Sequence, residues 1–330
     1  MRAAVYDRTG PAAEVLSLAE LPTPTPGPHE VRVRMKWSGV NPSDVKTRSG
    51  VRSKTLPFAR IVPHSDGAGV IDQVGEGVDR ARLGERVWLW NAAWNRPNGT
   101  AAEYVVLPAP QAVRLPDGID LAAGACLGIP ALTAYHAVSV DGGVSGKTVL
   151  VAGGAGAVGH YAVQFARLQG AGRILASVSS AEKAALARAA GADVAVNYRT
   201  ENLVERCLEA TAGAGLDRII EVDFAANVKP DLAAVRAEGD LIVYGSGAAE
   251  IAVPFVPAIQ KGVRLRFFIV YSLNPEDRAR SLQGVSENLA ANRLVHNIGA
   301  RLPLARIAEA HELVESGRVT GNVVLEIPSS

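Results

Sequence analysis

The sequence has few of the residues on which several classes of protein depend. It contains two cysteines, Cys126 and Cys207, in 330 residues, which is too few for a zinc cluster built from cysteine. Aromatic residues make up 5% of the chain, and the net charge is +1. With so small a net charge, the chain lacks the overall charge that attracts nucleic acid or an anionic membrane. No apolar run reaches the roughly 18 residues that a membrane span needs.

The N-terminal residues 1–7 also lack the apolar segment of a secretory signal peptide. We therefore expect a cytoplasmic protein, with no membrane association and no nucleic-acid partner. A hydrophobic content of 48% and a charged content of 20% are typical of a globular protein. The length is sufficient for two domains, each with its own core.

A glycine-rich stretch near the middle of the chain carries the strongest local signal. Residues 148–152 form a short apolar run, Gly154, Gly156 and Gly159 follow in the pattern G-x-G-x-x-G, and residues 158–168 place apolar side chains at helical spacing. In such a strand–turn–helix the first glycine allows a tight turn and the second lets a pyrophosphate approach the backbone. The third lets helix and strand pack closely. We predict a dinucleotide site here rather than a turn that only connects two elements.

Hydrophobic periodicity divides the chain into a β-rich part and a part in which strands and helices alternate. Short strands separated by turns are predicted at 31–37, 67–75, 86–90 and 102–107. After a helix at 121–138 and the strand at 148–152, further parallel strands are predicted at 173–178, 193–196, 217–222, 240–244 and 265–270, with helices between them such as 181–190. This pattern predicts an α/β protein with a doubly wound parallel sheet and a compact β domain.

The C-terminal part is predicted to contain helices at 275–291 and 304–316 and a last strand at 322–327. Because this strand is far from the parallel sheet in the sequence, we expect it to return to the N-terminal domain.

The end of the second parallel strand indicates which dinucleotide is bound. An NAD site places Asp or Glu there to bind the ribose hydroxyls, whereas this chain has Ser179 and Ser180, with Lys183 just beyond. Two hydroxyls and an ammonium are suited to a 2′-phosphate, so we predict NADPH. The alternative is that the serines cap a helix and Lys183 is a surface charge. Both roles are compatible, because a capped helix N-terminus also favours a phosphate.

Over essentially its full length the sequence resembles the medium-chain dehydrogenase/reductase superfamily. Within it, the chain is most similar to the zinc-free quinone oxidoreductase branch, which includes zeta-crystallin. The matching segments are 39–44, 48–50, 128–135, the glycine loop, 196–199 and 308–311. The resemblance implies a GroES-like β-barrel domain made of residues 1–120 and 271–330. A Rossmann dinucleotide-binding domain, residues 121–270, is inserted within it.

The resemblance also implies that no metal is bound. Asn41, Ser65 and Ile129 stand where the alcohol dehydrogenase branch has its Cys, His and Cys zinc ligands, and they cannot form a tetrahedral zinc site. His64 is adjacent but alone, and a lone histidine is more often structural or solvated than a ligand.

Candidate site residues follow from the glycine loop and from the resemblance. Asn41 is implied to lie by the nicotinamide, where its amide can donate to a carbonyl; an Asx-turn before Pro42 is the alternative. Lys46 stands where the family often has tyrosine, and it is the second catalytic candidate. The cofactor-binding candidates are Gly154, Ala155, Gly156, Ala157, Val158, Gly159, Ser179, Ser180, Lys183, Tyr198, Asn227, Thr133, Tyr244, Gly245, Ser246, Phe268, Ile269, Val270 and Asn322. For 268–270 a plain buried strand is an equal alternative.

The activity implied is an NADPH-dependent quinone oxidoreductase, in which hydride passes to a conjugated acceptor in the cleft between the two domains without zinc. Two alternatives remain open: an enone, enoyl or alkenal reductase, and an NADPH-binding structural or RNA-binding protein of the zeta-crystallin kind. The family commonly dimerises by joining the edge strands of two Rossmann sheets. The apolar segment 267–270 therefore predicts a symmetric homodimer.

Overall fold

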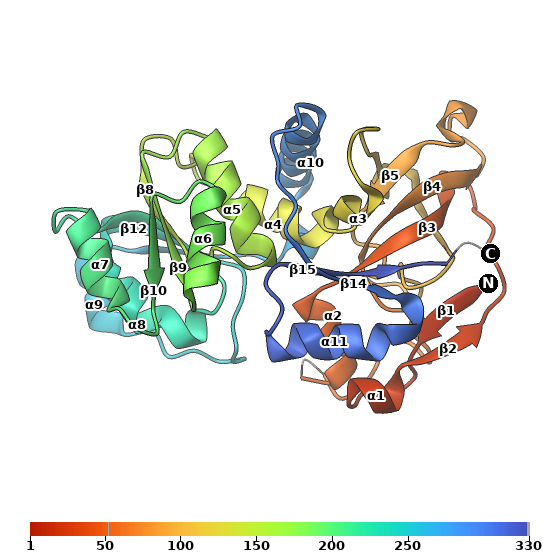
Figure 1. The fold of residues 1–330 in the computed structure, drawn as a ribbon, viewed down its shortest axis with the longest axis horizontal. Helices are drawn as coiled ribbons and strands as arrows, with labels where there is room; N and C mark the ends of the chain where they lie inside the picture. The colour runs from red at the N-terminus through yellow and green to blue at the C-terminus, as the bar shows by residue number, and fades with distance from the viewer. Residues whose placement is uncertain (52, 329–330) are drawn as a thin grey trace. The chain divides into compact units, whose positions relative to one another are not determined.

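The computed structural model describes residues 1–51 and 53–328, which form two compact units. Unit 1 takes in Met1–Ile129 and the chain from Ser286 onward, and unit 2 is Pro130–Val285. The domain boundaries expected from the resemblance lie near residues 120 and 270. Figure 1 shows the course of the chain, coloured by residue number.

Unit 1 is built on a mostly antiparallel sheet in the order β14-β15-β3-β4-β5-β7, with β6 paired to β3. Its strands are β3 (Glu30–Val40), β4 (Asp66–Val74), β5 (Arg86–Leu89), β6 (Tyr104–Pro108), β7 (Ala112–Arg114), β14 (Ile298–Pro303) and β15 (Asn322–Glu326), and β1 (Arg2–Val5) pairs separately with β2 (Ser17–Glu20). Val323 on β15 pairs with Val40 on β3. The prediction that the last strand returns to the N-terminal region is confirmed, whereas β14 was not predicted.

The core of unit 1 lies on one face of this sheet. Along β3 the alternate residues Val31, Val33 and Met35 are almost completely buried, as the alternating pattern predicts. Helix α11 packs against α2 and β15. The helical segments are α1 (Ala12–Val15), α2 (Pro42–Ser49), η1 (Arg80–Arg82), η2 (Ala109–Gln111), α3 (Leu121–Gly124), η5 (Leu304–Arg306) and α11 (Ile307–Ser316).

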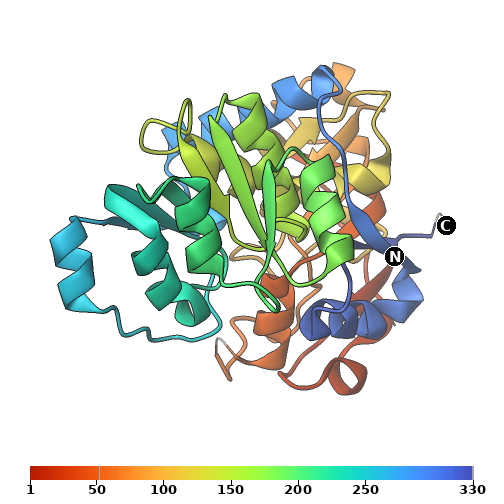
Figure 2. The same cartoon turned by 60° about the vertical axis from the view of Figure 1, so that its left-hand side comes forward.

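Unit 2 contains a parallel sheet in the order β10-β9-β8-β11-β12-β13. The strands are β8 (Thr148–Val151), β9 (Arg173–Val178), β10 (Val194–Asn197), β11 (Leu216–Glu221), β12 (Val235–Val243) and β13 (Arg264–Phe267). The helices are α4 (Leu132–Ser139), α5 (Ala157–Leu168), α6 (Ala181–Ala189), α7 (Leu203–Ala210), α8 (Phe224–Ala234), α9 (Phe255–Lys261) and α10 (Pro275–Ala290), the last of which continues into unit 1. Figures 1 and 2 show α5 and α6 lying over β8, β9 and β10. This is the predicted doubly wound Rossmann sheet, with its order reversing between β8 and β11.

Two predicted elements are wrong in detail. The sixth strand ends at Phe267 rather than Val270, and Val270–Ser272 forms a 3₁₀ turn (η4). The predicted helix 121–138 is interrupted by a π-helical turn, η3 (Leu127–Ala131), which contains Pro130. Proline has no N–H for the helical ladder and its ring crowds the preceding turn, so a regular helix cannot pass through it. In the part of the chain described, no helix combines the length and the apolar character that crossing a membrane requires.

Candidate functional site

The glycine turn joins β8 to α5 in unit 2. The left-handed backbone lies at Gly153, with φ +66°, so the tight turn that we assigned to Gly154 belongs to its neighbour. A Cβ on Gly154 would stand 2.6 Å from the Ala176 Cβ on β9, and one on Gly159 would stand 2.1 Å from the Gly153 carbonyl oxygen. Gly154 and Gly159 are therefore required by close packing within the strand–turn–helix unit.

Backbone donors surround this turn. Gly156 is the N-cap of α5 and has no side chain, and the first N–H groups of a helix have no partner within the helix. Those of Ala157 and Val158 therefore supply the positive end of the α5 dipole, as an anion site requires. Ser177 Oγ accepts a hydrogen bond from Gly153 N–H at 3.1 Å and so fixes the start of the turn. Sequence reasoning missed Ser177, because it lies within a predicted strand.

Ser179, Ser180 and Lys183 gather where β9 ends and α6 begins. Ser180 caps α6 by accepting from the Lys183 N–H at 3.2 Å, and Lys183 Nζ donates to Ser179 Oγ at 3.1 Å. Ser180 therefore caps the helix, as the alternative stated. Lys183, however, is not an extended surface charge: it is held against the end of β9 and is half-buried. The neighbouring carboxylate, Glu182, is exposed in the first turn of α6.

Tyr198 belongs to the same corner of unit 2. It follows β10, and its N–H donates to the carbonyl of Val178, the residue before Ser179, at 3.1 Å. The ring is 52% exposed. The structure thus brings Tyr198 beside the end of β9, with an aromatic face accessible to solvent.

The carboxyl ends of β11 and β12 hold a second group of candidates. A Cβ on Gly245 would stand 2.2 Å from the Val222 carbonyl oxygen, and a Cβ on Gly153 would meet the Val222 side chain at 3.5 Å. Val222 therefore lies between the glycine turn and Gly245. Ser246 Oγ donates to the Ala248 carbonyl at 2.7 Å, within its own loop.

The side chain of Asn227 contacts the buried carboxyl group of Glu221 rather than the glycine turn. Its Nδ2 donates to Glu221 Oε1 at 3.0 Å. Glu221 and Asp231 are 0% and 1% exposed. Burial, followed by the negative charge of Glu221 and the contact between the two side chains, raises the pKa of Asp231 to about 9. Because the Asp223 N–H also donates to Glu221, we assign the proton that the pair shares to Asp231.

The remaining unit 2 candidates form an aromatic cluster. The Phe268 ring lies 4.6 Å from the His136 ring and 6.3 Å from the Tyr244 ring. Burial lowers the pKa of His136 to about 4, so this imidazole is neutral at physiological pH. Thr133 is buried on α4, one turn before His136, and Val270 is buried after β13 while Ile269 is 40% exposed.

Asn322 belongs to the other unit, where it begins β15. Its Nδ2 donates to the Asn297 carbonyl at 3.0 Å.

In unit 1, Asn41 stands at the junction of β3 and α2. It is the N-cap of α2 and forms a capping box with Asp44: the Asn41 N–H donates to Asp44 Oδ2 at 2.8 Å. Its Nδ2 donates to Asp66 Oδ2, also at 2.8 Å. Asn41 is 4% and Asp66 0% exposed. The turn-forming alternative for Asn41 is thus realised in the fold, and it leaves one hydrogen of the Nδ2 amide for a further acceptor.

Burial raises the pKa of Asp66 well above its usual range, and the Asp44 charge adds to this. The Asn41 amide and the Ile129 N–H act in the opposite direction. Asp66 could not be identified from the sequence, because its partner Asn41 is 25 residues away.

Lys46 is not brought together with the Asn41 amide. It lies in the last turn of α2, whose first turn Asn41 caps. Five residues along a helix correspond to about 7.5 Å of axial rise. The two catalytic candidates therefore stand toward opposite ends of one short helix.

His64 is a core residue. Its Nε2 lies 2.9 Å from His311 Nε2 and its Nδ1 lies 2.8 Å from Ser38 Oγ. Burial, and then the neighbouring His311, lower the pKa of His64 well below its usual range. Ser38 and Thr100 continue the chain of hydrogen bonds to the Asp66 carbonyl. His64 is therefore buried and structural, but the expectation that it is alone is wrong, because His311 contacts it across 247 residues of chain.

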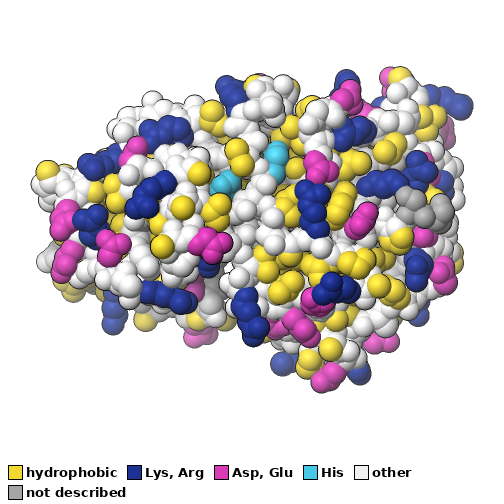
Figure 3. Space-filling model, viewed as in Figure 1, with side chains coloured by type: hydrophobic (Ala, Val, Ile, Leu, Met, Phe, Trp, Pro, Cys, Tyr) yellow, Lys and Arg dark blue, Asp and Glu magenta, His cyan; other side chains and the backbone are white. Residues whose placement is uncertain are grey.

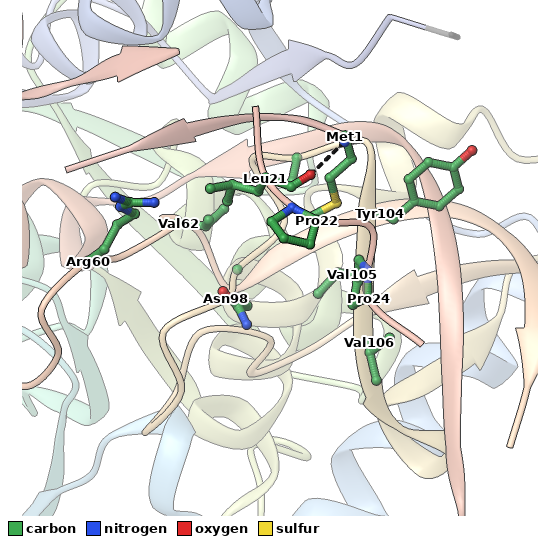
Figure 4. Close-up of a pocket in the computed structure, with 12 residues that line it drawn as sticks. Met1, Leu21, Pro22, Pro24, Arg60, Val62, Asn98, Tyr104, Val105 and Val106 are labelled. Atoms are coloured by element: carbon green, nitrogen blue, oxygen red, sulfur yellow. Dashed lines mark hydrogen bonds between the residues drawn. The ribbon is translucent and has the colours of Figure 1, made fainter. Parts of the chain in front are cut away.

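A cavity of about 280 Å³ opens on another part of unit 1. Figure 4 shows Met1, Leu21, Pro22 and Tyr104 along it, with Arg60 at one end. None of the residues predicted for the site lines it, so it is separate from the group around Asn41.

Comparison with known proteins gives the same architecture. Residues 27–117 match the family described as alcohol dehydrogenase GroES-like domain, and residues 157–287 match the family described as zinc-binding dehydrogenase. A human quinone oxidoreductase is 32% identical over 328 residues, covering 97% of this chain and 96% of that protein. A solved NAD-dependent alcohol dehydrogenase is 32% identical, with a TM-score of 0.90 and coverage of 99% and 100%. A mycobacterial protein solved with NADPH is 29% identical, with a TM-score of 0.87 and 99% of each chain covered.

A GroES-like unit joined to a Rossmann unit that carries a glycine turn defines the class of medium-chain dehydrogenases and reductases. Sequence relatives along the full length narrow this class further. The chain belongs to the quinone oxidoreductase branch of that superfamily, the branch that includes zeta-crystallin, and it is an oxidoreductase.

Proposed function

We propose that this protein is an NADPH-dependent, zinc-independent reductase of quinones or other conjugated carbonyl compounds. The observation that carries the proposal is the strand–turn–helix at Gly153–Gly159, with Ser179, Ser180 and Lys183 at the end of the next strand. A pyrophosphate fits the turn because no side chain covers Gly156. A 2′-phosphate fits the second group, where two hydroxyls and an ammonium replace the carboxylate of NAD sites. Tyr198 adds an exposed ring for the adenosine phosphate end.

The remaining cofactor candidates would serve the nicotinamide side. Thr133, Gly245, Phe268 and Ile269 are proposed to shape it on unit 2. Asn322 is a further proposed cofactor contact. The bound nicotinamide supplies a hydride, and the protein supplies orientation.

The acceptor is proposed to be oriented by Asn41. Its amide donates one hydrogen to Asp66 and offers the other to the acceptor oxygen, where negative charge develops as hydride arrives. A preorganised donor of this kind stabilises an oxyanion by a few kcal/mol. The buried imidazoles of His64 and His311 have strongly lowered pKa values and no place in this step, so we assign the proton delivered to the oxygen to water.

Zinc independence is part of the proposal. A zinc alcohol dehydrogenase needs nitrogen and sulfur ligands at the positions held here by Asn41, Ser65 and Ile129. The Asn41 amide nitrogen is a hydrogen-bond donor to Asp66, and isoleucine has no donor atom. A conjugated acceptor delocalises the charge that a Lewis acid would otherwise stabilise.

The RNA-binding alternative receives no support from the net charge or from the face of the molecule shown in Figure 3. The net charge is +1, and on the face shown in Figure 3 basic side chains are interspersed with acidic ones. A nucleic-acid site normally gathers basic residues on one face or along one groove.

Two single variants test the proposed roles. Asn41→Ala should lower kcat with a conjugated acceptor by roughly 100-fold, the effect of losing one oxyanion donor, while the affinity for NADPH stays near that of the wild type. Lys46→Ala is the matched comparison from the same helix. If Lys46→Ala abolishes turnover and Asn41→Ala leaves it unchanged, the lysine is the proton donor or anchor and the proposed assignment is wrong.

A further inference from the structure

The buried carboxyl group of Asp66 is the direct partner of the Asn41 amide. The distance from Asn41 Nδ2 to Asp66 Oδ2 is 2.8 Å, and Asp66 is fully buried. Its second oxygen, Oδ1, is also buried and forms no hydrogen bond of standard geometry within the described residues, although the Ile129 N–H acts on the carboxyl group. A buried carboxyl group that forms few hydrogen bonds is costly for a fold. Its presence therefore needs an explanation beyond packing.

Two contacts hold the main chain of Asp66 in place. On the β3–β4 ladder Asp66 is paired with Gly39, two residues before Asn41. A Cβ on Gly39 would stand 3.1 Å from the Asp66 Cβ and 2.1 Å from the Ala125 carbonyl oxygen, so the absence of a side chain at Gly39 makes room for this arrangement. Thr100 Oγ1 donates to the Asp66 carbonyl. The carboxyl group thus stands on a rigid strand beside the end of β3.

The orientation of an asparagine amide depends on its partners, because its oxygen and nitrogen ends have nearly the same shape. At Asn41 the two partners act together. The capping box holds Asn41 against Asp44, with the Asp44 N–H donating to the Asn41 main-chain carbonyl at 3.0 Å, and Asp66 Oδ2 accepts from the side-chain nitrogen. Without Asp66, the capping box alone would hold the side chain, and nothing would define the direction of the second N–H.

We propose that Asp66 is a positioning residue, which fixes the Asn41 amide so that its free N–H points at the acceptor oxygen. This inference rests on the proposed function of Asn41 and extends it to a fully buried residue behind the amide. The essential property is an acceptor oxygen at the place of Oδ2. An asparagine at position 66 retains such an oxygen, whereas an alanine does not.

The test is a double-mutant cycle on kcat, measured with NADPH and a simple quinone. Asp66→Ala should reduce kcat roughly as much as Asn41→Ala, about 100-fold, and Asp66→Asn should retain most of the activity. The double variant should be no slower than Asn41→Ala alone, because a residue that acts only through Asn41 has nothing left to position. Reductions that multiply in the double variant would overturn the proposal.

A matched control separates positioning from stability. Ser38→Ala removes another buried polar group from the neighbouring strand, β3, where Ser38 pairs with Gly67 beside Asp66, through the loss of its contacts with His64 and Thr100. It should lower the thermal midpoint without a comparable loss of kcat. If Asp66→Ala does not fold, Asp66→Asn still tests the proposal: it should retain most of the activity because it keeps an acceptor oxygen, and a loss as large as that of Asn41→Ala would overturn the proposal.

A second measurement does not depend on turnover. The side-chain amide protons of Asn41, assigned in NMR spectra by their loss in Asn41→Ala, should exchange slowly with solvent in the wild type. They should exchange faster in Asp66→Ala and remain slow in Asp66→Asn. An Asn41 amide that is unaffected by Asp66→Ala would overturn the positioning role. Wild-type protein without quinone turnover but with a slow, Asp66-dependent amide would instead refute the proposed function alone.

Discussion

The ammonium of Lys183 donates a hydrogen bond to Ser179 Oγ at 3.1 Å, where strand β9 gives way to helix α6. This contact places a positive charge at the strand end at which NAD enzymes carry a carboxylate. We expect Lys183→Ala to weaken NADPH binding by roughly ten-fold, equivalent to about 1.4 kcal/mol for one charge-assisted contact, and to leave NADH binding nearly unchanged. Titration with both cofactors checks this result.

Lys229→Ala is a suitable control for that titration, because Lys229 is an exposed lysine on α8 of the same unit. It should preserve the cofactor preference. Equal affinity of the wild-type protein for NADPH and NADH would contradict the assignment of the 2′-phosphate site.

Metal content is a second prediction. Because Asn41, Ser65 and Ile129 lack the donor atoms of a zinc site, elemental analysis of the purified protein should find no stoichiometric zinc. Incubation with a chelator should leave turnover unchanged. Stoichiometric zinc, or activity restored by zinc after chelation, would refute the zinc-independent mechanism.

Assembly is a third prediction. Strand β13 is the edge of the parallel sheet, and Phe267 on it is 59% exposed; on the adjoining helix α9, Phe255 and Ile259 are 71% and 61% exposed. An open edge with exposed apolar side chains favours pairing with another copy. We propose a symmetric homodimer through this edge.

Light scattering at micromolar concentration should therefore give twice the mass of one chain. Phe255→Glu should shift the population toward monomer, whereas Val51→Glu, which changes an exposed apolar residue of unit 1, should not. A monomeric wild type would count against the proposed dimer.

The pair formed by Glu221 and Asp231 predicts a pH dependence of stability. In the folded protein burial and Glu221 raise the pKa of Asp231 from 3.8 to about 9. Between pH 3.8 and about pH 9, Asp231 is protonated in the folded chain and ionised in the unfolded chain. The stabilisation that results from this proton is complete below about pH 4 and is lost as the pH rises toward 9. The slope is at most about 1.4 kcal/mol per pH unit for one proton.

Asp231→Asn removes this titration while keeping a donor for Glu221. Its thermal midpoint should fall less than that of the wild type between about pH 7 and pH 9. Asp117→Asn changes an exposed carboxylate and should follow the wild type. Parallel curves for wild type and Asp231→Asn would show that Asp231 does not hold the proton.

Elements defined by a local pattern could be predicted from the sequence. The alternation of Val31, Val33 and Met35 identifies β3, and the apolar run before Gly154 identifies β8. The last strand was placed correctly because it lies far from the parallel sheet in the sequence, and it pairs with β3. The interrupted helix near Pro130 was missed, although the proline itself was a visible signal.

The polar contacts that define the sites could not be predicted in this way. Asp66 meets Asn41 across two strands, and His64 meets His311 over 247 residues of chain. Periodicity reports which face of an element is buried, but it carries no information about which buried polar groups face one another. Asp231 is similar: its position on α8 says nothing about the acid on β11 until the two elements pack together.

The central claim is that the chain transfers hydride from NADPH to conjugated carbonyl acceptors. The most direct measurement mixes the purified protein with NADPH and a panel of simple quinones and enones, and follows the absorbance of the reduced nicotinamide. We expect oxidation of NADPH that depends on both protein and acceptor, and faster turnover with one of the two acceptor classes identifies the preferred substrate. NADPH that binds but is not oxidised with any quinone or enone would contradict the account and favour a binding role for this protein.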